Sequence, residues 1–80
     1  INTLESDRYF SGDEIQKELQ RAILMLSDKQ RIVFNMRYFD EMPYEEMSQA
    51  LGAAVGTLKA TYHNAVQKVE AALKIVDTLN

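Results

Sequence analysis

The residues best suited to chemistry are a run of small or hydrogen-bonding side chains late in the sequence: Gly56, Thr57, Lys59, Ala60, His63 and Asn64. On a helix, such residues fit the major groove of DNA, because small side chains allow close approach and polar ones contact base edges. Lys59, His63 and Asn64 are the candidate base readers, and Asn64 is suited to adenine. Thr57 and Lys68 are better placed for phosphates. This run therefore predicts DNA contacts.

The other reactive side chains do not form a recognisable site. His63 has no second histidine, cysteine or suitably spaced carboxylate to share a metal, so we interpret it as a groove-facing residue, with a solvated surface histidine as the alternative. Glu45 and Glu46 point about 100° apart on a helix and do not converge; their charges instead complement the start of a helix. We expect no enzyme activity, metal or cofactor.

Composition predicts a small helical domain. Eighty residues form one domain, and three glycines and one proline among many helix-forming residues favour an all-α fold. The absence of cysteine fits a reducing, cytoplasmic interior, and no apolar run approaches the ~20 residues of a membrane span. The chain starts without a methionine, so we expect a segment of a longer protein.

The net charge of −3 argues against simple electrostatic binding to DNA, but the charge is unevenly distributed. Residues 1–46 carry six basic and ten acidic side chains, whereas residues 47–80 carry three basic and two acidic ones. The basic balance thus lies on the last helix, and it is weak.

Two amphipathic helices are predicted in the first half of the chain. Apolar residues recur at helical spacing from Glu14 to Leu26, with Asp13 as the N-cap. Ser27 and Gln30 form a capping-box pattern, which predicts a second helix over residues 28–39. The apolar positions of the first helix are Ile15, Leu19, Ala22, Ile23 and Leu26. The second helix has an apolar face wide enough to pack against two neighbouring helices. Its residues are Ile32, Val33, Phe34, Met36, Tyr38 and Phe39.

The second half predicts a helix-turn-helix. A short helix is expected over residues 44–51, with Pro43 in its first turn, and Gly52 as the left-handed residue that ends it. A long helix is expected over residues 55–76, apolar on one face and polar or small on the other. Tyr44, Met47 and Leu51 share one side of the short helix. The apolar face of the long helix holds Val55, Leu58, Tyr62, Ala65, Val69, Ala72 and Val76, opposite Gly56, Ala60, His63, Gln67, Ala71 and Lys74.

Residues 26–73 resemble region 4 of sigma-70-type factors, specifically of the extracytoplasmic-function class. The matching pieces are Arg31, Val33, Phe34, "RYF" at residues 37–39, "YEE" at residues 44–46, Leu51-Gly52 and "VGTLK" at residues 55–59. The resemblance implies an all-α, four-helix domain with a C-terminal helix-turn-helix, similar to a winged helix but without a wing. It also implies recognition of the promoter −35 element, binding to the β-flap of bacterial core RNA polymerase, and masking by an anti-sigma factor.

The resemblance also divides the chain and extends the set of DNA contacts. Residues 1–12 would be a linker from an absent upstream domain, and residues 13–80 the region 4-like domain. The residues expected to contact DNA are Gly56, Thr57, Lys59, Ala60, Thr61, His63, Asn64, Lys68 and Arg37.

Several positions depart from the family pattern. Ala54 stands where the family commonly has a serine that caps the recognition helix, a loss of about 0.5–2 kcal/mol. Ala60-Thr61 stand where the family has Ser-Arg, and Asn64 and Val66 stand at or near arginine positions. Each bidentate arginine–guanine contact that is missing removes about 1–3 kcal/mol of discrimination.

Other side chains allow two interpretations. Arg37 either binds a phosphate or pairs with Asp40 or Glu41, and Tyr62 is expected in the core rather than stacked on a base. The four methionines, Met25, Met36, Met42 and Met47, are expected in the core or at its edge, although one or two could line the groove for the flap helix. The acidic residues Asp40, Glu41, Glu45 and Glu46 are expected to be solvated, with a basic partner as the alternative.

The preferred function is promoter recognition as a detachable specificity subunit of RNA polymerase. One alternative is a helical interaction module that docks polymerase or an anti-sigma factor without reading DNA. The other is the helix-turn-helix output domain of a response regulator. Exposed partner-binding surface would also let the isolated domain self-associate.

Overall fold

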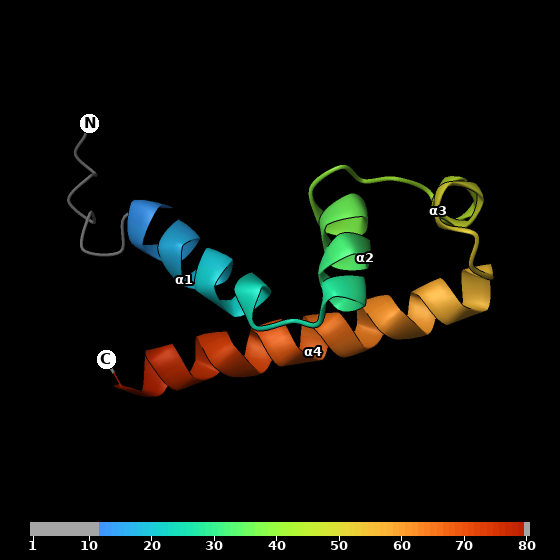
Figure 1. The fold of residues 1–80 in the computed structure, drawn as a ribbon. Helices are drawn as coiled ribbons and strands as arrows, with labels where there is room; N and C mark the ends of the chain where they lie inside the picture. Colours follow the sequence, from blue (N-terminus) through green and yellow to red (C-terminus); the bar gives the residue numbers. More distant parts are fainter. Residues whose placement is uncertain (1–11, 80) are drawn as a thin grey trace.

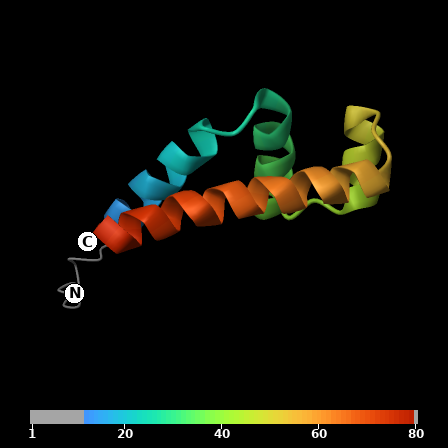
Figure 2. The same ribbon diagram turned by 90° about the horizontal axis from the view of Figure 1, so that it is seen from below.

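In the computed structural model, residues 12–79 are described, with side chains for residues 14–73, and they form four α-helices without a strand (Figure 1). The helices are α1 (Gly12–Leu24), α2 (Asp28–Tyr38), α3 (Tyr44–Leu51) and α4 (Val55–Leu79). Figure 1 and Figure 2 show that the three shorter helices lie along one side of α4. The predicted all-α class with a C-terminal helix-turn-helix is confirmed. The predicted linker lies outside the described residues except for Gly12, which already belongs to α1.

The turn between α1 and α2 is fixed by side-chain hydrogen bonds. The predicted capping box is present: the Ser27 hydroxyl accepts from the Gln30 N–H, and Gln30 Oε1 accepts from the Ser27 N–H, each at 3.2 Å. Arg31 Nη2 donates to the Leu26 carbonyl, just beyond the end of α1, at 3.2 Å. These bonds set the direction in which α2 leaves α1.

Some predicted helix ends were wrong by one to three residues, as is usual because terminal turns fray. Since α1 begins at Gly12 and ends at Leu24, Asp13 lies inside its first turn and is not the N-cap. The second helix ends at Tyr38, one residue early, with Phe39 as its C-cap. The long helix α4 continues to Leu79.

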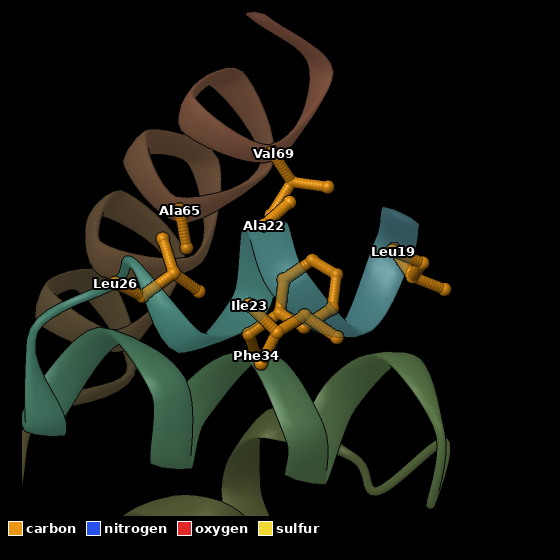
Figure 3. Packing of buried hydrophobic residues seen from close by; sticks show 7 residues of the cluster. All are labelled: Leu19, Ala22, Ile23, Leu26, Phe34, Ala65 and Val69. Atoms are coloured by element: carbon orange, nitrogen blue, oxygen red, sulfur yellow. The ribbon is translucent and has the colours of Figure 1, made fainter. Parts of the chain in front are cut away.

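The larger of two hydrophobic clusters joins α1, the turn that follows it, α2 and the middle of α4 (Figure 3). We call this group the first cluster: Leu19, Ala22, Ile23, Leu26, Phe34, Ala65 and Val69. All seven side chains are at most 9% exposed. All seven come from positions predicted to lie on the apolar faces of the helices, and the prediction is confirmed for these residues.

A smaller second cluster joins α2, α3 and the N-terminal half of α4. It consists of Val33, Met47 and Leu58, each at most 1% exposed. Tyr62 packs against both clusters, and its ring centroid lies 5.8 Å from that of Phe34. The core placement of Tyr62 is confirmed, as is the prediction that α2 faces two neighbours, because Val33 and Phe34 enter different clusters.

Several apolar residues expected in the core are instead exposed. Met25 is 78% exposed, which contradicts its placement at the core, whereas Met36 and Met42 pack on the second cluster. Leu51 is partly exposed on the outer end of α3. Ile15, Ile32, Tyr38 and Phe39 are also exposed, by 45–55%. Residues on the apolar face of a helix are buried only where a neighbouring helix packs against them.

Among the helices of residues 12–79, none combines the length and apolar content needed to cross a bilayer. Over the same part of the chain, no three His, Cys, Asp or Glu side chains are grouped to hold a metal ion.

Candidate nucleic-acid interface

The unit formed by α3, a short turn and α4 positions the predicted contact residues. Gly52 ends α3 with φ +68° and ψ +31°, the left-handed conformation predicted from the sequence, and its N–H bonds the Ser48 carbonyl at 2.8 Å. The Ser48 hydroxyl donates to the carbonyl of Ala53 within the turn. Met47 is fully buried against Leu58, so α3 braces the start of α4.

Neither helix of this unit begins with a capping side chain. Pro43 is the N-cap of α3, one position before the predicted first turn, and it makes no side-chain cap. At α4, the Ala54 carbonyl accepts the Leu58 N–H at 3.0 Å, but the Ala54 methyl group has no acceptor for the free N–H groups. The first turns of both helices therefore keep N–H groups that a ligand oxygen could accept from.

One face of α4 is open to solvent along the predicted stripe. Gly56, Ala60 and His63 are all exposed, and so is the flanking Asn64. Thr61 is half-buried. The opposite face is the buried one, as Leu58, Ala65 and Val69 are at most 4% exposed. The structure thus brings the predicted groove-facing residues together on one surface. The predicted positions Val76 and Lys74 lie outside the described side chains.

Gly56 leaves open space at the start of this face. A Cβ atom built there would meet nothing within 4 Å. Its φ is not left-handed, and it sits in the first turn of a regular helix. Neither packing nor backbone conformation within the domain requires glycine at this position. Close approach of the helix to a DNA groove would require a residue without a side chain.

Arg37 and Lys59 both lie against the ring of Tyr44, where α2, α3 and α4 meet. Arg37 Cζ is 5.0 Å, and Lys59 Nζ 5.7 Å, from the ring centroid of Tyr44. Cation–π contacts at exposed sites contribute about 0.5–1 kcal/mol. Arg37 Nη1 also donates to the Met42 carbonyl at 3.0 Å. The pairing of Arg37 with Asp40 or Glu41 was wrong within the described residues, because the guanidinium turns toward α3 instead.

Lys68 is held by α2. Its Nζ donates to Gln30 Oε1 at 3.1 Å, and that same oxygen accepts from the Ser27 N–H in the capping box. Thr57, by contrast, is exposed beside the open stripe. The two residues predicted to contact phosphates therefore lie at different heights along α4, about 16 Å apart at 1.5 Å per residue.

Tyr62 lies where α2, α3 and α4 meet, and its surroundings change its acidity. Burial, followed by the nearby Tyr44, raises the pKa of Tyr62 above its ordinary value, while Arg37 lowers it in part. Its hydroxyl is therefore neutral at neutral pH and adds no charge to the interface.

Sequence reasoning did not identify the roles of Tyr44 and Gln30. Tyr44 was placed on the packing side of the short helix, and Gln30 was identified only as a capping residue. Their contacts with Lys59 and Lys68 span 15 and 38 positions of the sequence. No local spacing signals such a pair, and only the packing of α4 on α2 and α3 creates it.

Comparison with known proteins identifies a family that matches most of the described residues. The family described as "Sigma-70, region 4" matches residues 16–69. The "RNA polymerase sigma-E factor" of Streptomyces antibioticus is 36% identical over 70 residues, which cover 81% of this chain and 39% of the relative. The "ECF RNA polymerase sigma factor SigW" of Bacillus subtilis strain 168 is 38% identical over 50 residues, 62% of this chain and 27% of the relative. The chain spans less than half the length of these relatives, and the resemblance noted from the sequence is confirmed.

Proposed function

Because this chain belongs to the sigma-70 region 4 family, we propose that it recognises the −35 element of promoters as part of a sigma factor in a bacterial RNA polymerase. It would supply specificity to the polymerase in the cytoplasm, with no catalytic step of its own. The observation that carries the proposal is the open face of α4. Small and polar residues occupy that face, whereas the rest of the helix is anchored in two clusters.

The low positive charge of this face is compatible with such a role. A protein that neutralises only a few phosphates binds free DNA weakly and with a shallow salt dependence. If polymerase carries the domain to the promoter, DNA binding becomes intramolecular, with an effective concentration on the order of millimolar. Groove fit and a few hydrogen bonds then suffice. We expect the isolated domain to give a weak gel shift or none.

A second surface supports docking to polymerase. The ring of Tyr38 stacks on Phe34 at 5.1 Å, and Phe39 packs edge-on against both rings, yet the two outer rings are 51% and 45% exposed. We call Tyr38 and Phe39 the aromatic edge. It lies at the C-terminal end of α2, which stands clear of α4 (Figure 1). The β-flap is the partner we propose for it, and an anti-sigma factor would compete there.

Footprinting of the reconstituted holoenzyme tests promoter recognition. The full-length protein carrying Lys59→Ala plus His63→Ala should lose protection near −35, because both changes lie at the proposed DNA surface. Lys17→Ala plus Gln20→Ala is the matched control, since it removes a lysine and a polar side chain from an exposed face of α1. Unchanged protection and promoter choice in the first variant would favour the alternative of a docking module that does not read DNA.

A further inference from the structure

Two cations from different helices lie against the ring of Tyr44, the first residue of α3. Arg37 comes from the last turn of α2, and Lys59 from the second turn of α4. Among residues 14–73, neither forms an ion pair with a carboxylate, although Glu45 and Glu46 lie in the first turn of α3. The ring therefore gathers two positive charges that nothing in the described part of the chain neutralises.

The arrangement suits an anion that approaches from solvent. Two cations held against one ring raise the local positive potential, which favours an anion at this junction. Arg37 is already oriented by the Met42 carbonyl and keeps further N–H donors, and Lys59 is exposed. In a protein that binds DNA, the anion nearest to such a site is a phosphate of the DNA backbone.

We propose that Tyr44 is a positioning residue, whose ring directs the Lys59 ammonium to a DNA phosphate, together with Arg37, instead of to a base edge. The proposal rests on promoter recognition by α4. Lys59 reaches toward α3, whereas His63 belongs to the open stripe on the outer face of α4. Base reading then falls to His63 and Asn64, and the lysine of "VGTLK" sets the position of the helix on the duplex.

A phosphate contact and a base contact leave different signatures. Loss of a phosphate contact weakens binding to every sequence alike and makes the plot of log K against log salt shallower by about 1. Loss of a base contact weakens discrimination at one position. We therefore expect Lys59→Ala to weaken matched and mismatched −35 duplexes by one common factor, with a shallower salt slope. His63→Ala should reduce discrimination and keep the slope.

The role of Tyr44 is tested by two variants in the full-length protein bound to core polymerase. Tyr44→Phe keeps the ring and should keep both the affinity and the slope. Tyr44→Leu keeps apolar volume beside the second cluster but removes the π-face, so it should weaken binding to every sequence by a common factor. The double variant Tyr44→Leu plus Lys59→Ala should be weakened by less than the product of the two single effects, because both changes act on the Lys59 contact.

Two outcomes would overturn the proposal. If Lys59→Ala alters preference at one base pair with the salt slope unchanged, Lys59 reads a base. If Tyr44→Leu weakens binding equally with and without Lys59, the tyrosine acts through packing alone. Absence of −35 protection in the unsubstituted holoenzyme is a separate result, which would contradict the proposed function instead.

Discussion

The start and the middle of α4 rest on clusters of very different character. The start packs through the second cluster, in which three residues are almost completely buried and α3 closes the end. The middle packs through the first cluster, which is larger but leaves the aromatic edge half-exposed against Phe34. A surface that reads DNA must be held rigidly, whereas one that docks a protein must leave apolar area uncovered. On the proposed function, the start of α4 serves DNA recognition and the aromatic edge beside the first cluster serves docking.

Met47→Ala should have the largest effect. Met47 is fully buried, so truncation loses its buried apolar contacts and leaves a cavity, and we expect a loss of about 2–5 kcal/mol in the free energy of unfolding. Urea denaturation of the isolated chain measures this. Met25→Ala, the same change at a 78% exposed position, should alter stability by less than about 0.5 kcal/mol. Equal effects of the two changes would mean that the second cluster is not the anchor of the helix-turn-helix.

Met25 and Met47 also show where sequence reasoning succeeds and where it stops. The bounds of α3, the left-handed Gly52 and the Ser27–Gln30 capping box are local features, and all three were predicted correctly. Periodicity placed Met47 in the core and was right, but the same expectation for Met25 was wrong. A residue at the end of a helix is buried only if another element covers it, and no sequence pattern reports that.

In the candidate interface, too, local features could be predicted from the sequence and features that depend on tertiary packing could not. The open stripe of α4 could be predicted, because 100° per residue fixes which residues share a face. The destinations of Arg37 and Lys68 could not, because both depend on how α2 packs against α3 and α4. Arg37 meets Met42 and Tyr44 instead of an acidic neighbour, since the chain turns after α2 and brings α3 close to its last turn.

Phe39→Ala tests whether the aromatic edge is the docking surface for polymerase. Phe39 is 45% exposed and belongs to the aromatic edge, so the change should cost less than about 2 kcal/mol of stability but weaken binding to core polymerase at least tenfold, by about 1.4 kcal/mol or more. Binding to immobilised core enzyme measures this. Ile32→Ala, on the same helix and 50% exposed, is the control and should retain binding. If both variants bind normally, the aromatic edge is not the docking surface.

Gly56→Ala separates stability from DNA recognition at the start of α4. Glycine in a helix costs roughly 0.5–1 kcal/mol relative to alanine, and the added Cβ meets nothing, so the variant should be more stable by about that amount. Promoter binding by the holoenzyme should nevertheless weaken, because the methyl group holds the helix away from the bases.

Gly52→Ala is the matched control for this change. Its Cβ also meets nothing within 4 Å, but the φ of +68° should cost about 1–2 kcal/mol of stability. Gly56→Ala with unchanged promoter binding would show that the start of α4 does not approach DNA closely.

Tyr62→Phe probes the link between the two clusters and should have the smallest effect. Burial raises the pKa of Tyr62, so the folded state keeps its proton at a pH at which the unfolded state has lost it. The stability associated with this proton is fully present below about pH 10, the ordinary tyrosine value, and is lost as the pH rises through the higher folded value. The difference in urea midpoint between Tyr62→Phe and the unsubstituted chain should therefore be constant from pH 7 to 9 and move in favour of the variant above pH 10. A difference that stays constant up to pH 11 would mean that water reaches the hydroxyl, and hence that the two clusters are less firmly joined than their shared tyrosine implies.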